Sequence, residues 1–390
     1  MIIEIKYSLS NDTWDENELC AINRVIASNR YSMGKEVSEY EKEFAKKFGS
    51  KFAIMSNSGS SANLLAVASL VYSGKLKKND EVLVPAVSWS TTYFPLEQFG
   101  LKTRLVDIDI NTLNIELDLI EKAITPSTKA VFAVNLLGNI VDYEKLSDIC
   151  KANNLIFFED NCESMGASLK GKKAGTFGLL GTYSTFYSHH LATMEGGVTV
   201  TDNEELYQYM LSIRAHGWTR NLPKSSSLYT KNEDDFYESF QFIVPGFNLR
   251  PIEMEAAIGK EQLRKLDSFI EIRRNNAMLF KELMANDKRF FTQNETGEAS
   301  WFGFAIILSP SIAGQRQKFI KALREAGIEV RPIVAGNFAK QPAFKYMNAT
   351  ISGDLKNADY IHENGFFVGN HSIPMEEQLN LLKETLDSVK

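Results

Sequence analysis

The segment YSTFYSHHLATMEGG, residues 183–197, brings together residues that can carry out chemistry. It contains the adjacent histidines His189 and His190, two of the five histidines in the chain, and it ends with Glu195 and two glycines. An imidazole with an ordinary pKa near ~6.5 takes up and releases protons at neutral pH. Hydroxyls, aromatic rings and paired glycines are typical of a loop around a cofactor, so the segment predicts proton transfer at a bound group.

A metal site is the first alternative for the histidine pair. Neighbouring residues do not face each other on a helix or a strand, and no Asp or Glu has the spacing of a helical zinc motif. The three cysteines, Cys20, Cys150 and Cys162, are widely spaced and form no CxxC pair. We therefore expect neither a metal site nor a disulfide framework. One buried and one exposed structural histidine remains the simplest alternative.

Three further features lie where strands are expected to end. In SNSGSSANLLAVASL, from residue 56, a Ser/Gly turn opens a helix whose free N–H groups could bind a phosphate, although a well-capped helix would look the same. Asp160 follows the apolar run LIFFE, where a carboxylate could pair with a cationic ring nitrogen or cap the next helix. Trp89 follows EVLVPAVS and could stack on a planar ligand or pack in the core.

The order of these features describes a pyridoxal-phosphate (PLP) site: Ser/Gly turn, aromatic ring, Asp after a strand, Ser184, Glu-Gly-Gly, then Asn248 before a long helix. With these motifs the chain resembles the DegT/DnrJ/EryC1/StrS family of nucleotide-sugar aminotransferases over nearly its whole length. The resemblance rests on YSMGKEVSEYEKEFAKKFGSKFAIMSNSGSSA, VDIDINTLNIE, TKAVFAVNLLGN, FFEDNCESMGA, GTFGLLGTYSTF and GFNLRPIEMEAAIGKEQLRKLD.

The resemblance includes one departure from the family pattern. The family commonly has a lysine six residues before the Glu of Glu-Gly-Gly, where it forms a Schiff base with the cofactor. Counting back six residues from Glu195 gives His189, and no lysine occurs from residue 174 to residue 223. This pattern is similar to the pyridoxamine-phosphate (PMP)-dependent sugar 3-dehydratases of the family, in which histidine replaces the lysine, and most of all to the branch that serves colitose biosynthesis.

The resemblance implies removal of the C3 hydroxyl from GDP-4-keto-6-deoxy-D-mannose, giving GDP-4-keto-3,6-dideoxy-D-mannose. Imidazole cannot hold the cofactor covalently, so PMP would be the resting form and glutamate would regenerate it, releasing 2-oxoglutarate. His189 would be the base, and Asp160 would keep the ring nitrogen protonated. His190 would support His189 from behind. The base of the nucleotide rests on the resemblance alone, because no local motif indicates guanine.

By position, the resemblance also assigns the binding residues. It places Ser58, Gly59, Ser60 and Ser184 at the cofactor phosphate, with Asn248 reaching in from the second subunit of a homodimer. Trp89 would stack on the ring, and Glu163 would lie near it. The side chains that remain as substrate candidates are His190, His216, Arg220, Arg250 and Arg331.

Three other functions fit parts of the pattern. A PLP-dependent nucleotide-sugar 4-aminotransferase would need a lysine from elsewhere in the chain. A CDP-sugar 3-dehydratase also carries histidine here, but it resembles an iron–sulfur enzyme that needs four cysteine ligands, and this chain has three cysteines. A catalytically inactive PLP-fold binding protein would not require the cofactor residues that the chain retains.

These residues need a fold that brings strand ends together. Short apolar runs alternate with helical segments up to residue 250, which is typical of an α/β protein with a mostly parallel sheet covered on both faces. Thr13 and Glu16 are expected to form the capping box of the first helix. We expect the fold of type I PLP-dependent transferases, with a large PLP/PMP-binding domain over residues 1–250. Residues 251–390 would form a connecting helix and a small C-terminal α+β domain.

Composition agrees with a two-domain enzyme. The chain has 390 residues, 44% hydrophobic content and a net charge of −6, which gives no support for nucleic-acid binding. Its apolar runs are shorter than the ~20 residues that span a bilayer, and Glu4 and Lys6 interrupt any signal-peptide core. We therefore expect a cytoplasmic protein with no membrane partner and no iron–sulfur cluster.

An iron chelator should leave the implied dehydratase activity unchanged, because three scattered cysteines cannot supply the four ligands of a cluster. Turnover measured before and after chelation tests this expectation. Activity that is lost on chelation and restored by iron would contradict it.

Overall fold

An eight-stranded sheet forms the centre of the computed structural model, which describes residues 4–389. The strand order is β1-β9-β8-β5-β4-β2-β3-β12. β9 runs antiparallel to both of its neighbours, whereas the pairs from β8 to β12 are all parallel. The predicted α/β fold with a mostly parallel sheet is confirmed. The strands are β1 (Phe52–Ser56), β2 (Glu81–Pro85), β3 (Lys102–Val106), β4 (Thr128–Val134), β5 (Ile156–Asp160), β8 (Gly181–Ser184), β9 (Gly197–Thr201) and β12 (Ala349–Ile351).

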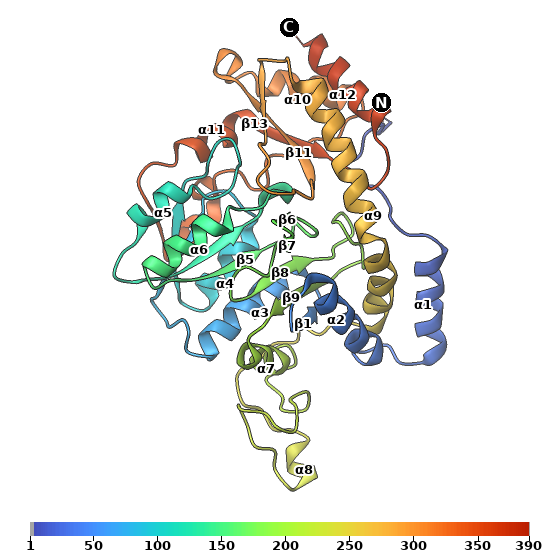
Figure 1. Ribbon diagram of the computed structural model, residues 1–390, viewed down its shortest axis with the longest axis vertical. Coiled ribbons are helices and arrows are strands. Elements are labelled where there is room, and N and C mark those ends of the chain that lie inside the picture. The colour runs from blue at the N-terminus through green and yellow to red at the C-terminus, as the bar shows by residue number, and fades with distance from the viewer. Residues whose placement is uncertain (1–3, 390) are drawn as a thin grey trace.

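Helices cover both faces of this sheet (Figure 1). Alternate side chains of one strand enter different cores: Val82 and Val84 pack in one, and Leu83 between them packs in the other. Since successive strand side chains point to opposite faces, this pattern requires apolar cover on each side. The covering helices include α3 (Gly59–Tyr72), α4 (Ser90–Gln98), α5 (Leu117–Ala123), α6 (Tyr143–Ala152) and α7 (Glu204–Ile213).

The predicted capping box of the first helix is wrong in its residues. α1 (Glu16–Ser28) has Asp15 as its N-cap, and the backbone N–H of Asp15 donates to Glu18 Oε2 at 2.8 Å. The hydroxyl of Thr13 instead donates to Gln262 on the long helix α9 (Glu253–Met284). The sequence offered two overlapping pairs with the same spacing, and the tertiary contact of Thr13 separates them.

The helix α9 (Glu253–Met284) connects the large sheet to a smaller α+β unit (Figure 1). This unit contains a three-stranded antiparallel sheet in the order β10-β11-β13. Its elements are β10 (Phe290–Thr292), β11 (Gly303–Leu308), α10 (Arg316–Glu325), β13 (Gly365–Gly369) and α12 (Glu376–Ser388); α11 (Lys356–Asn364) lies between the two units. An arm of mostly irregular structure, residues 217–247, carries the short helix α8 (Asp235–Glu238) away from the body in Figure 1.

The helix α9 begins just after residue 250, as predicted for the domain boundary. Two segments, however, pack in the domain to which the prediction did not assign them. Tyr7, from the N-terminal segment, is buried in the core of the smaller unit. β12, from the C-terminal region, extends the large sheet beside β3. The division at residue 250 therefore remains a proposal about the main bodies of the two domains. No helix among residues 4–389 is long and apolar enough to cross a membrane.

Replacing Glu253 with Gln should destabilise the contact between α9 and α2 (Lys35–Phe48). The buried carboxylate of Glu253 accepts the backbone N–H groups of Gly34, Glu36 and Val37 at 2.7–3.0 Å. Glutamine keeps only one accepting oxygen, so at least one of these N–H groups loses its acceptor, and we expect a loss of about 1–3 kcal/mol in urea unfolding. Glu282→Gln, at an exposed position on the same helix, is the control, and equal unfolding midpoints for the two variants would contradict the expectation.

Candidate active site

The N-terminus of α3 forms a cradle that suits a phosphate. Ser58 is the N-cap, and its hydroxyl accepts the N–H of Ser61 at 3.0 Å. The N–H groups of Gly59 and Ser60, at the first two helical positions, have no acceptor within the helix and carry the positive end of its dipole. A Cβ atom at Gly59 would lie 2.5 Å from Cβ of Ser184. Only glycine therefore lets the end of β8 approach this helix, and the cradle fits a dianionic group.

The carboxylate of Asp160 lies beside this cradle, at the carboxyl end of β5. Its Oδ2 accepts the side-chain amide of Asn63 and the hydroxyl of Thr92, both at 2.8 Å, and its Oδ1 accepts the backbone N–H of Cys162 at 3.1 Å. The sulfur of Cys162 would also lie 3.1 Å from a Cβ at Gly59. Three donors thus orient a carboxylate that is only 5% exposed, as pairing with a ring nitrogen requires.

Two further predicted residues lie at the same edge of the sheet. Trp89 is the N-cap residue of α4 and is 57% exposed, so its indole is free to stack on a ligand. Oε2 of Glu163 accepts the backbone N–H of Leu137 at 2.9 Å. Burial, with a smaller contribution from the negative charge of Asp160, raises the pKa of Glu163 to about 7. This carboxyl can therefore carry a proton near neutral pH.

The histidine segment forms a tight loop. The N–H of His189 donates to the carbonyl of Phe186 at 2.9 Å, and the N–H of Thr193 donates to the carbonyl of Thr185 at 2.9 Å. The segment at the two histidines is therefore a turn and not an extended strand. This turn separates the two side chains: His190 has no exposed surface, whereas His189 is partly exposed.

The two imidazoles have different partners. Nε2 of His190 lies 3.1 Å from the carbonyl oxygen of Ser300, which holds the ring in the interior. Nδ1 of His189 is buried and has no hydrogen-bond partner among the described residues. Burial, and then the positive charge of Arg273, lowers the pKa of His189 to about 4. His189 is therefore neutral at physiological pH and can accept a proton.

A ring contact and several backbone hydrogen bonds connect His189 to the segment that carries Asp160 and Glu163. The ring of Phe302 meets the ring of His189 edge to face, with centroids 5.1 Å apart. The N–H of Phe302 donates to the carbonyl of Leu137, and Leu137 in turn donates to Glu163. The N–H of Asn135, at the start of the same loop, donates to the carbonyl of Asp160. The loop after β4 thus binds Asp160, Glu163 and Phe302, the residue whose ring contacts His189.

The predicted substrate residues are either buried or not joined by a hydrogen bond to His189, Asp160 or Glu163 in the described part of the chain. His190 cannot touch a sugar as placed, because it has no exposed surface. The remaining candidates are polar groups at or near the surface, and no hydrogen bond joins their side chains to Asp160 or His189 within residues 4–389. They are His216, Arg220 and Arg250 at the base of the arm, and Arg331 beside β13. Asn248, predicted at the cofactor phosphate, is exposed, and its Oδ1 accepts the Nε–H of Arg250 at 2.9 Å.

Four residues that shape the site were not predicted from the sequence. Asn63 and Thr92 bind Asp160 and lie within the first two turns of α3 and α4. A polar residue in the apolar run ANLLAVASL was a signal for Asn63. Phe302 and Arg273 reach the site from the C-terminal part of the chain, and no local pattern marks them.

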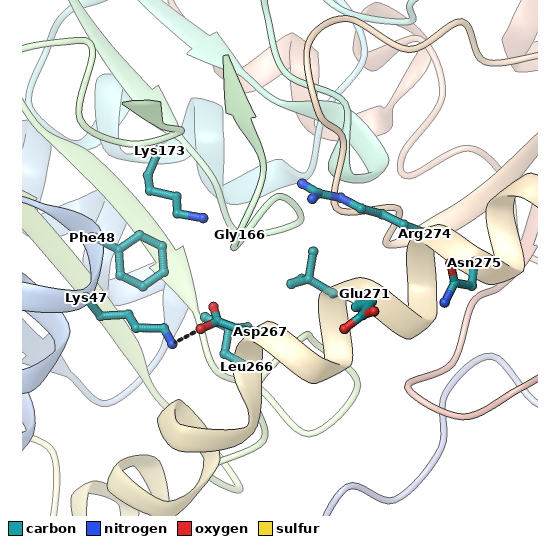
Figure 2. Close-up of a pocket in the computed structure, with 10 residues that line it drawn as sticks. Lys47, Phe48, Gly166, Lys173, Leu266, Asp267, Glu271, Arg274 and Asn275 are labelled. Atoms are coloured by element: carbon teal, nitrogen blue, oxygen red, sulfur yellow. Dashed lines mark hydrogen bonds and ion pairs between the residues drawn. The ribbon is translucent and has the colours of Figure 1, made fainter. Parts of the chain in front are cut away.

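A separate surface pocket of about 270 Å³ lies between α2, α9 and the loop at Gly166 (Figure 2). Figure 2 shows charges of both signs around it, with Lys47 paired to Asp267 at 2.7 Å. None of the predicted site residues lines this pocket. Within residues 4–389, no group of three or more metal-ligating side chains is present.

Comparison with known proteins gives close matches to this arrangement. The model of the DegT/DnrJ/EryC1/StrS aminotransferase family matches residues 12–386. The chain is 55% identical over 390 residues to GDP-4-keto-6-deoxy-D-mannose 3-dehydratase of Yersinia pseudotuberculosis, covering 98% of this chain and 99% of that enzyme.

Two solved structures of a GDP-4-keto-6-deoxymannose 3-dehydratase are also similar, each 51% identical and covering 98% of this chain and all of the other. One is a histidine-to-asparagine variant with bound GDP-perosamine, with a TM-score of 0.96. The other holds a trapped PLP–glutamate geminal diamine, with a TM-score of 0.95.

Gly59→Ala should weaken binding of PLP and PMP by about tenfold or more, a change of ~1.4 kcal/mol. The added methyl would force Ser184 away from the cradle, since their Cβ atoms would be 2.5 Å apart. Fluorescence titration of the cofactor-free protein measures this affinity. Ser73→Ala, at the other end of α3, is the control, and equal affinities for the two variants would contradict the cradle.

Proposed function

Because the chain belongs to the DegT/DnrJ/EryC1/StrS aminotransferase family, we propose that it is a PMP-dependent 3-dehydratase of GDP-4-keto-6-deoxy-D-mannose. The product is GDP-4-keto-3,6-dideoxy-D-mannose, and glutamate restores PMP. The observation that carries the proposal is the neutral, partly buried His189 in the loop where other members have a lysine. The GDP-perosamine and the glutamate adduct bound to similar enzymes support the substrate and the amino donor.

The residues of the site fit the cofactor. The free N–H groups of Gly59 and Ser60, with the hydroxyl of Ser184, would hold its phosphate. The oriented carboxylate of Asp160 would keep the ring nitrogen protonated, and Trp89 would cover the ring. When bound, PMP supplies an amine that can join the C4 ketone and a ring that accepts electron density.

The proton steps belong to His189 and Glu163. His189, neutral at physiological pH, would take the proton from C4′ and deliver one to the departing C3 hydroxyl. Glu163, with a pKa near 7, would share a proton near the ring. Lysine at position 189 would bond to the cofactor and compete with the sugar for it, which is the behaviour of an aminotransferase. The absence of lysine from residue 174 to residue 223 disfavours that alternative.

We also propose a homodimer in which Asn248 of one chain completes the phosphate site of the other. Asn248 and Ser60 are both exposed in the single chain. Asn248 lies at the base of the projecting arm, where its backbone pairs with Ala215. Sedimentation equilibrium tests the dimer, and Asn248→Ala should weaken PLP binding. A monomer with full cofactor affinity would contradict this proposal.

The test of the function is a product assay. The protein is incubated with PMP, glutamate and a panel of nucleotide-linked 4-keto-6-deoxyhexoses, and the sugars are examined by mass spectrometry. We expect ammonia release and loss of the C3 oxygen with the GDP sugar. A 4-amino sugar that keeps its C3 oxygen would identify an aminotransferase instead, and no turnover of any sugar would support the inactive relative.

His189→Asn should remove dehydration almost completely and slow the glutamate half-reaction, because both need a proton moved at C4′. General acid–base groups contribute about 10²–10⁴-fold, and steady-state ammonia release measures the loss. His190→Asn is the matched variant and should reduce kcat less, since His190 supports the loop through Ser300. A greater loss for His190→Asn would exchange the two roles.

The pH dependence gives a second measurement of the same assignment. His189 must be neutral to accept a proton, and its pKa is about 4. In Glu163→Gln, which lacks the carboxyl with a pKa of about 7, the rate should therefore fall only as the pH approaches the pKa of His189. A decline centred near the ordinary imidazole pKa of ~6.5 in that variant would contradict the assignment.

A further inference from the structure

Arg273 is a buried cation without a carboxylate partner. It lies on α9 with 2% of its surface exposed, and no acidic group among residues 4–389 is within ion-pair distance. Its guanidinium donates instead to the carbonyl oxygens of Asn370 at 2.7 Å, Phe302 at 3.3 Å and Trp301 at 3.4 Å. Burying an arginine without a counter-ion is costly, so its position calls for a role beyond packing.

Two of the carbonyl groups that Arg273 binds, those of Trp301 and Phe302, belong to the segment that contacts His189 and His190. The ring of Phe302 lies 5.1 Å from the ring of His189 and 5.8 Å from that of His190. The carbonyl of Ser300, two residues earlier, contacts His190. Segment 300–302 therefore contacts both imidazoles and the guanidinium.

Three elements bring charged or titratable groups near His189. Arg273 comes from α9, and His190 is the next residue of the loop. Glu163 comes from the loop after β5. It accepts the N–H of Leu137, and the carbonyl of Leu137 accepts the N–H of Phe302. Burial is the main reason that the pKa of His189 is lowered, and the charge of Arg273 acts in the same direction.

We propose that Arg273 is a positioning residue for His189: it holds segment 300–302 against the imidazole, and its uncompensated charge disfavours the cationic form of that ring. The inference rests on the proposed role of His189 as the base. A nearby cation favours the neutral form of His189, which accepts the proton, and it favours release of that proton to the leaving hydroxyl.

Histidine NMR of the PMP-loaded protein tests the proposal without relying on turnover. The chain has five histidines, and His189→Asn assigns the ring signal of His189. Arg273→Met removes the charge, and we expect it to raise the titration midpoint of His189 by about one pH unit. Arg274→Met is the matched control, since Arg274 also binds backbone carbonyls, those of Ala299 and Glu298, but not those of segment 300–302. An unchanged midpoint in Arg273→Met would overturn the proposal.

Arg273→Lys keeps the positive charge but loses the planar guanidinium. This variant tests the proposal if Arg273→Met does not fold. We expect its His189 midpoint to stay within about 0.3 units of wild type, while kcat falls about tenfold with little change in KM. A wild-type kcat in this variant, or a midpoint raised as far as for loss of charge, would overturn the proposal. If the midpoints move as expected but no sugar is dehydrated, the proposed function fails, and only the effect of Arg273 on the titration of His189 stands.

Discussion

The carboxylate of Asp160 accepts three hydrogen bonds, and each donor comes from a different element. Asn63 belongs to the helix that forms the phosphate cradle, Thr92 to the helix that begins after Trp89, and Cys162 to the loop that carries Glu163. Because the carboxylate is buried, leaving any of these donors unpaired would be costly. One interaction therefore fixes the relative positions of the groups proposed to hold the phosphate, the ring face and the ring nitrogen.

This arrangement matters because an imidazole cannot bond to the cofactor. In a lysine enzyme a covalent link helps to keep the cofactor in place, whereas here the noncovalent contacts would have to suffice. The cradle at Gly59 and the carboxylate of Asp160 would supply contacts at two separated points of the cofactor. His189 would then be free to move protons, and burial and the charge of Arg273 lower its pKa and favour its neutral state.

The sequence predicted the fold class and the motifs that the structure gathers at one edge of the sheet. These features are local, since a strand end, a glycine turn or a capped helix is encoded by a few adjacent residues. The shape of the histidine loop was not predicted, because it depends on backbone pairs between Thr185 and Thr193. Arg273 and Phe302 were missed for a similar reason: their positions beside His189 depend on how α9 and the smaller unit pack against the sheet.

Histidine at position 189 would leave the cofactor without a covalent bond to the protein. Intact-mass measurement of the cofactor-loaded protein after borohydride reduction distinguishes a free cofactor from a bound one. We expect an unmodified chain for the wild type, and a chain that carries one reduced cofactor for His189→Lys. A cofactor fixed to the wild-type chain would contradict the proposed role of His189, because another residue would then be acting as the missing lysine.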